Sequence, residues 1–136
     1  MATTIAQLTL TSTDLLSDSL AVSSVATLTA AGNSTGLTRT EGLGRKQTGN
    51  TSEYTLFTAS EHTDDKAHKI YLKNTSTTAA QYFEIKLGDI QMGRLYAGDW
   101  AFFPWNADTG TTPDADVLVT PSHADMMLEY MLFTDE

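Results

Sequence analysis

The chain has 136 residues, with 17 acidic and 8 basic side chains, a formal net charge of −9 and no cysteine. This length suits a single domain, or one domain with an arm, and it allows a core to form without disulfides or a structural metal. The missing cysteines exclude disulfide scaffolds, thiolate metal sites and thiol nucleophiles. The acidic balance argues against a nucleic-acid partner, because binding phosphates needs clustered Lys and Arg.

The first part of the chain is rich in Thr, Ser, Ala and Gly. Hydrophobic alternation predicts strands over residues 5–10 and 20–28, and composition predicts a turn at 31–36. Residues 37–49 carry three glycines and a basic pair, which favours an extended segment or a long loop. We therefore expect residues 1–50 to form a Thr-rich N-terminal arm that contains one or two strands.

The rest of the chain alternates with period 2, the signal of β-strands. The predicted strands are residues 53–59, 69–73, 81–87, 90–96, 100–103, 116–120 and 127–133. Short strands separated by turn residues, with no segment of helical period longer than a turn or two, predict an all-β fold. We expect an antiparallel β-sandwich of jelly-roll type over residues 51–136.

The last predicted strand is apolar on both sides. Leu128, Tyr130 and Leu132 lie on one side, whereas Met127, Met131 and Phe133 lie on the other, interrupted by Glu129. The second side is covered either by another subunit or by the N-terminal arm. Alternatively, the strand lies wholly inside the monomer, since core strands of sandwiches also read as continuous apolar runs.

The densest polar cluster surrounds two histidines. It consists of Glu61, His62, Asp64, Asp65 and His68. The spacing lacks the glycine and the terminal glutamate of a calcium loop, so a solvated loop is the better interpretation. The predicted strands after residue 69 contain no histidine, which fails the ligand count of a metal-dependent cupin. With no Gly-x-Ser-x-Gly elbow or Ser-x-x-Lys pair, we expect no catalytic, cofactor or metal-binding residues and no enzymatic activity.

Aromatic residues follow a Gly-Asp turn. Trp100 and Trp105, together with Tyr96, could form a platform for stacking against sugars, which makes a carbohydrate-binding module one alternative function. The other interpretation of these side chains is packing in the core and at its rim. The longest strongly apolar run, residues 100–105, is far too short to cross a bilayer, and the N-terminus does not read as a secretory signal, so no membrane partner is expected.

Several segments resemble a known class of protein. They are residues 68–75 (HKIYLKNT), 93–105 (GRLYAGDWAFFPW) and 128–133 (LEYMLF), with residues 15–20 (LLSDSL) and 36–43 (GLTRTEGL) near the N-terminus. The chain resembles small virion structural proteins of tailed phages, especially marine and cyanobacterial phages. The resemblance implies a β-sandwich that decorates or cements the capsid by bridging major capsid proteins. A neck, tail or fibre-associated component is the alternative within the virion.

The resemblance also implies partners and a location. It implies a homo-oligomer, with a trimer favoured, on the capsid surface of a virion assembled from protein made in the host cytoplasm. Met127, Met131 and Phe133 would then form the subunit interface. Arg39, Arg45 and Lys46 would anchor the arm on an acidic capsid shell, although a solvated basic loop is an equally simple interpretation of these three.

Overall fold

The computed structural model describes the chain except for residues 1–2, 16, 18, 30–38 and 136. The expected turn at residues 31–36 lies outside the described residues. The described strands are β1 (Thr3–Ser12), β2 (Leu20–Thr29), β3 (Arg39–Thr40), β4 (Gly44–Gln47), β5 (Tyr54–Phe57), β6 (Lys69–Asn74), β7 (Tyr82–Leu87), β8 (Ile90–Tyr96), β9 (Trp100–Pro104), β10 (Val117–Pro121) and β11 (Met127–Thr134). A short 3-10 helix, η1 (Ala59–Glu61), follows β5. Within these described parts, no helix has the length and apolar character needed to span a membrane.

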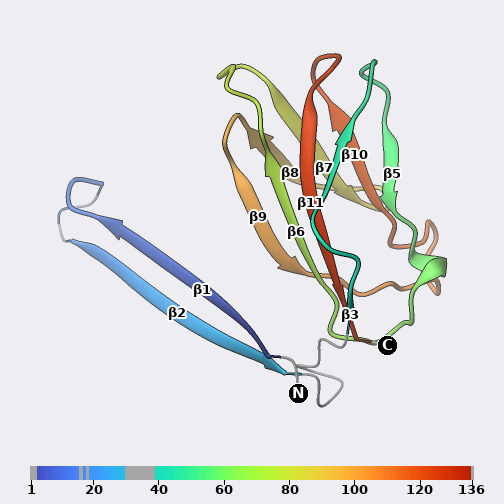
Figure 1. Cartoon of the computed structure of the whole chain (residues 1–136), viewed down its shortest axis with the longest axis horizontal. Coiled ribbons are helices and arrows are strands. Elements are labelled where there is room, and N and C mark those ends of the chain that lie inside the picture. The colour runs from blue at the N-terminus through green and yellow to red at the C-terminus, as the bar shows by residue number, and fades with distance from the viewer. Residues whose placement is uncertain (1–2, 16, 18, 30–38, 136) are drawn as a thin grey trace.

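Two antiparallel sheets pack face to face (Figure 1). One has the order β5-β10-β7-β8, and the other has the order β4-β11-β6-β9, with β3 pairing on the same side of β11 as β4. Jelly-roll strands are conventionally lettered B to I in chain order, and β4 to β11 correspond to these eight letters. The two sheets then have the strand orders C-H-E-F and B-I-D-G, which are those of a jelly roll. The prediction of an all-β, jelly-roll-like sandwich is confirmed.

The core lies between the two sheets because each strand buries alternate residues. Ile70 and Leu72 of β6 and Leu128 of β11 are fully buried, and they face Phe83 and Val119 from the other sheet. Burying an aliphatic or aromatic side chain of this size contributes roughly 1.5–3 kcal/mol. The expected dry side of residues 81–87 is therefore correct, since Phe83 belongs to it.

The expected boundary after residue 50 is wrong for one segment. β4 pairs with β11 from Met127 to Tyr130, and β3 pairs with the end of the same strand. Gly42, between β3 and β4, has a φ of +84°, a conformation that L side chains rarely adopt. Gly44 approaches Tyr130 so closely that an added Cβ would lie 2.6 Å from its ring. The segment from Arg39 to Gln47 thus supplies the first strand of the jelly roll and is not part of a separate arm.

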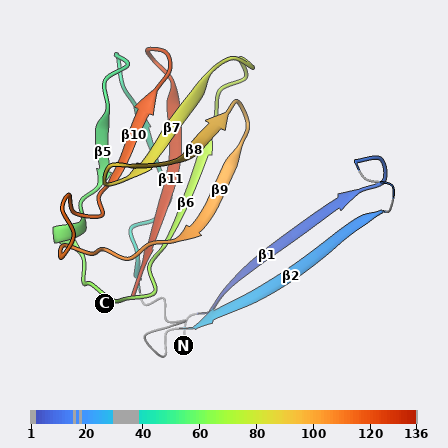
Figure 2. The same ribbon diagram turned by 180° about the vertical axis from the view of Figure 1, so that it is seen from behind.

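The true arm is a β-hairpin. β1 and β2 pair in continuous register from Thr3 opposite Thr29 to Ser12 opposite Leu20, which confirms the two strands predicted there. The Ser12 hydroxyl accepts a hydrogen bond from the Leu15 amide at 3.1 Å at the start of the connection. Ten residues per strand give a hairpin about 33 Å long. It projects away from the sandwich in both views (Figures 1 and 2).

Candidate interaction surface

The outer face of the sheet that contains β11 is aromatic. The register places Phe102 of β9 beside Tyr71 of β6, and Tyr71 beside Met131 of β11, so that the three form a row across the sheet. Phe133 lies two residues further along β11, opposite Lys69, and its ring is edge-on to that of Phe102 at a centroid distance of 6.1 Å. Trp100 is the first residue of β9, and its side chain is 54% exposed. We call Tyr71, Trp100, Phe102, Met131 and Phe133 the aromatic face.

One carboxylate adjoins the aromatic face. Oε2 of Glu129 accepts hydrogen bonds from Nε and Nη2 of Arg45 at 3.0 and 2.9 Å, and Oε1 accepts one from the Tyr71 hydroxyl at 3.2 Å. The Arg45 guanidinium holds the pKa of Glu129 below its usual value. Burial and the bond to Glu129 raise the pKa of Tyr71. The Glu129 charge is therefore compensated by Arg45. Lys69 and Lys73 of β6 lie on the same side of the sheet, so charged side chains border the aromatic face.

The hairpin has one predominantly apolar side. Alternation along the paired strands places the following residues on that side, here called the leucine face: Ala6, Leu8, Leu10, Leu20, Val22, Ala26 and Leu28. Leu28, near the base, is 7% exposed, whereas Leu10 and Val22, a cross-strand pair nearer the tip, are 46% and 43% exposed. The other side carries mainly Thr, Ser and Gln, with Ile5 and Val25 among them.

The aromatic face and the base of the hairpin enclose an open groove of about 470 Å³. Its walls are Thr4, Ile5, Ala6, Gln7, Leu8, Ser24 and Ala26 of the hairpin and Tyr71, Trp100, Phe102 and Phe133 of the sandwich. Two mainly apolar surfaces thus lie on opposite sides of a groove that none of the described residues fills. The chemistry available here is apolar contact, which suits a protein or another extended apolar ligand.

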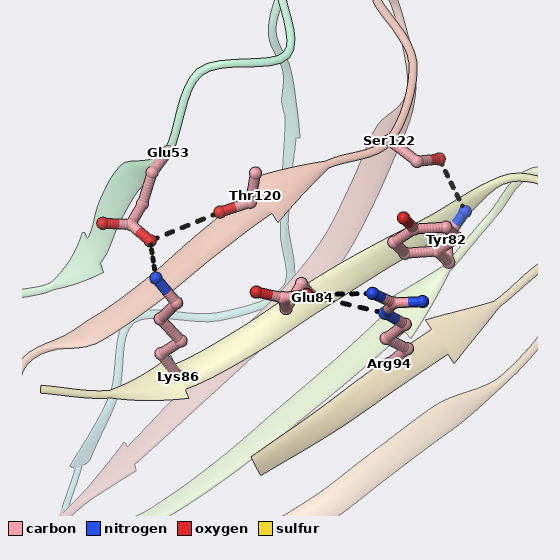
Figure 3. Close-up of polar contacts among 7 residues, drawn as sticks. All are labelled: Glu53, Tyr82, Glu84, Lys86, Arg94, Thr120 and Ser122. Carbon is pink, nitrogen blue, oxygen red and sulfur yellow. Dashed lines mark hydrogen bonds and ion pairs between the residues drawn. The ribbon is translucent and has the colours of Figure 1, made fainter. Parts of the chain in front are cut away.

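The outer face of the other sheet has the opposite character (Figure 3). Lys86 pairs with Glu53 at 2.7 Å, and the Thr120 hydroxyl also donates to Glu53. On the neighbouring strands, Arg94 lies 3.5 Å from Glu84 and stacks over the ring of Tyr82. We call this the polar face, since its charged groups satisfy one another in contact with water.

The structure places the predicted interface residues on the aromatic side of the molecule. Met127, Met131 and Phe133 point outward from β11 and are half-buried, while Leu128 and Leu132 point into the core. β11 is a central strand of its sheet, as the interpretation of a strand inside the monomer requires. Its second side nevertheless remains accessible, so whether a subunit covers these residues stays a prediction.

The three predicted basic anchors do not form one cluster. Arg45 and Lys46 are adjacent in β4 and therefore point to opposite sides of the sheet. Arg45 pairs with Glu129, whereas the Lys46 ammonium lies 4.4 Å from the centre of the Tyr54 ring, a cation–π contact. Arg39 lies in β3, opposite Thr134. Nothing in the sequence pattern indicated that these residues pair with the last strand.

One of the three aromatic residues expected in a sugar-binding platform is buried. Trp105 is 2% exposed, and its indole Nε1 donates to the Ala115 carbonyl at 2.8 Å, so it is a core residue. Trp100 and Tyr96 are exposed, but they lie on strands of different sheets. A stacking site built from all three aromatics is therefore excluded.

Within the cluster around the two histidines, His68 has a structural role. His68 is fully buried, with Nε2 2.9 Å from the Thr63 carbonyl and Nδ1 accepting a hydrogen bond from the Asp135 amide. This pattern requires the Nε2–H tautomer, in which both ring nitrogens are satisfied. The expectation of a solvated loop is thus wrong for His68, because its ring packs against Trp105. Across the residues that the structure describes, no group of three or more His, Cys, Asp or Glu is placed to hold a metal ion.

Comparison with known proteins adds no relative. No protein-family model matches the chain, and no curated protein or solved structure is significantly similar to it. The aromatic face, the leucine face and the groove between them are therefore the features from which a function has to be argued.

Proposed function

We propose that this chain is a phage virion structural protein, and most specifically a decoration or cement protein of the capsid. The observation that carries the proposal is a jelly roll with a projecting apolar hairpin and an aromatic outer face. Jelly rolls are a recurrent architecture of viral capsid domains. Contiguous exposed apolar surface on a small domain is typical of protein–protein contact sites. The resemblance of several sequence segments to phage structural proteins points the same way.

In this proposal the two parts of the chain have different tasks. The sandwich is the rigid body that sits on the shell, and the hairpin extends its reach to a neighbour. A decoration protein bridges major capsid proteins, so many weak contacts act together on one particle and give high avidity. A position at the neck, tail or a fibre would use the same two surfaces and is the alternative within the virion.

The edge formed by β3 and β4 is the proposed contact with the capsid shell. The Arg45 side chain remains 61% exposed although it pairs with Glu129, and Arg39 lies on the same edge. Both side chains are exposed in a chain with a net charge of −9, so this edge offers an acidic partner two guanidinium groups to approach. The Lys46 ammonium stacks on Tyr54, which leaves this role mainly to Arg39 and Arg45.

Binding to phage heads tests the proposal. Purified chain is mixed with undecorated heads of the phage whose genome encodes it, and co-sedimentation and electron microscopy measure occupancy. We expect saturable binding at regular positions on the shell, which weakens with salt. The variant Arg39→Glu should weaken binding, whereas Arg94→Glu, on the polar face, should not. Absence of saturable binding to heads, with binding to necks, tails or fibres tested in parallel, would contradict a decoration role.

A carbohydrate-binding module remains a second candidate because Trp100 is exposed beside a groove, and lectin domains also use jelly rolls. Affinity electrophoresis against a panel of polysaccharides distinguishes the two functions. A decoration protein shows no retardation. Retardation that disappears in Trp100→Ala, but not in Tyr96→Ala, would favour the binding module instead.

A further inference from the structure

We propose that the chain associates with itself through these two surfaces: the outer half of one copy's hairpin enters the groove of a second copy and packs its leucine face on that copy's aromatic face. The proposal does not depend on a role in a virion. It names the occupant of the groove as a second copy of this chain.

The first argument is that the hairpin is unsuited to solvent. β1 and β2 contain no Asp, Glu, Lys or Arg in a chain that is 18% charged. An isolated two-stranded hairpin is at best marginally stable in water, and it becomes stable when an apolar face packs against another layer. A projecting, uncharged hairpin therefore needs a covering surface.

The second argument is that the chain already shows which surface fits. At its base the hairpin turns Ala6, Leu8 and Ala26 of the leucine face toward the groove, and Phe102 and Phe133 form the opposite wall. The leucine face thus lies opposite the aromatic face within one copy, although only along part of the hairpin and with the open groove between them. A second copy supplies the same two surfaces again.

The third argument is length. The hairpin is about 33 Å long, whereas β9, which carries Trp100 and Phe102, has five residues and spans about 17 Å. The hairpin diverges from its own sandwich toward its tip (Figures 1 and 2). Leu10 and Val22 are consequently 46% and 43% exposed, and the chain's own sandwich does not cover them in this arrangement.

Electrostatics gives the association a recognisable salt response. Each copy carries a net charge of −9, so copies repel one another, while the proposed contact is apolar. Added salt screens the repulsion and leaves the apolar contact in place. Self-association should therefore strengthen with salt, in contrast to an attachment through basic residues.

A charge-pair variant tests the leucine face. Leu10→Glu with Val22→Lys places opposite charges on one cross-strand pair, so the hairpin can still pair while its apolar surface is lost. The matched control, Thr9→Glu with Ser23→Lys, makes the same change one position away, on the other side of the hairpin. Sedimentation velocity should show an oligomer for the wild type and the control, and at least a tenfold weaker association for the first variant. A monomeric wild type, or an undiminished oligomer in the first variant, would overturn the proposal.

Cysteine cross-linking then locates the contact, because the natural chain has no cysteine. Leu10→Cys is made in one batch, and Lys73→Cys, beside Trp100 on the aromatic side of β6, is made in another. Mild oxidation of the mixture should give a disulfide-linked heterodimer. Thr9→Cys, which faces away, should give much less with the same partner. If Leu10→Cys and Lys73→Cys in one chain form only an intramolecular disulfide and the mixture forms none, the hairpin covers its own sandwich and the proposal fails.

Discussion

The two outer faces of the sandwich are built on the same alternation of residues but have opposite chemistry. On the polar face, Glu53, Lys86, Glu84 and Arg94 are arranged as neighbouring ion pairs. On the aromatic side, outward Tyr, Phe, Trp and Met residues form one cluster, with Lys69, Lys73 and Glu129 around it. A sheet needs only one apolar face to form a sandwich. The second apolar face is therefore not required for the sandwich to form, and the proposed contacts with another protein are placed on this side of the molecule.

The largest effect should come from removing the first strand of the aromatic-faced sheet. Deletion of residues 1–29 removes the hairpin alone and should leave a cooperatively folding sandwich. Deletion of residues 1–47 also removes β3 and β4, which leaves one edge of β11 without its partners and strips Arg45 from Glu129. We expect this shorter chain to lose its cooperative thermal transition in circular dichroism and near-UV spectra. A cooperative transition after the longer deletion would show that β5 to β11 suffice for the fold.

The next effect concerns association. Trp100 and Tyr96 are exposed aromatics, at 54% and 43%, but Trp100 lies on the aromatic face and Tyr96 on the polar-faced sheet. Trp100→Glu should weaken self-association at least tenfold in sedimentation equilibrium, because it places a charge in the apolar contact. Tyr96→Glu should change it less than twofold. Equal effects of the two substitutions would remove the distinction between the faces.

A glycine in each sheet sharpens the comparison of packing. A Cβ on Gly44 would lie 2.6 Å from the Tyr130 ring, which is itself held edge-on to Phe57, whereas a Cβ on Gly93 would meet nothing within 4 Å. Gly44→Ala should therefore destabilise the protein by about 1–3 kcal/mol, the typical cost of overpacking. Gly93→Ala should be close to neutral. Chemical denaturation with urea measures both, and a neutral Gly44→Ala would mean that β4 does not press on Tyr130.

The smallest effect is electrostatic. The pKa of Glu129 is lowered in the folded protein, chiefly by Arg45, so its charged form is favoured by folding. Its stabilisation is therefore complete above the unfolded pKa of about 4.3 and is lost as the pH falls toward the lower folded value. Glu129→Gln should lower the thermal midpoint at pH 7, and the difference from wild type should vanish in acid.

The exposed pair on the polar face supplies the control for this measurement. Glu84 lies 3.5 Å from Arg94, a longer contact than the 2.9 Å between Glu129 and Arg45. Exposed pairs of this kind contribute little to stability. Glu84→Gln should thus shift the midpoint less than Glu129→Gln at pH 7. A deficit of Glu129→Gln that persisted in acid would assign its effect to packing and not to charge.

Much of this architecture could be predicted from alternation alone. The strand from Tyr82 to Leu87 showed its dry side directly, because Phe83 and Ile85 alternate with Glu84 and Lys86. The β4 strand was missed since its residues, Gly-Arg-Lys-Gln, carry no apolar alternation. It is a strand because β11 offers it a hydrogen-bonding edge, which is a tertiary cause.

The candidate site was only partly visible in the sequence for the same reason. The outward apolar side of β11 could be read from Met127, Met131 and Phe133. Its continuation across Tyr71 and Phe102 depends on the register between three strands that are far apart in the chain. Local spacing predicts a solvated loop for His68 and leaves Trp105 open between a platform and the core, because it does not reveal burial by distant segments.

The most direct test is the solution mass of the intact protein, measured by light scattering over a dilution series at low and moderate salt. A protein whose aromatic face and leucine face bind one another between copies should have a mass above that of the 14.7 kDa chain, falling on dilution and rising with salt. A mass of one chain under all these conditions would contradict the central claim. It would mean that the aromatic face meets a different partner or is covered by the chain's own hairpin.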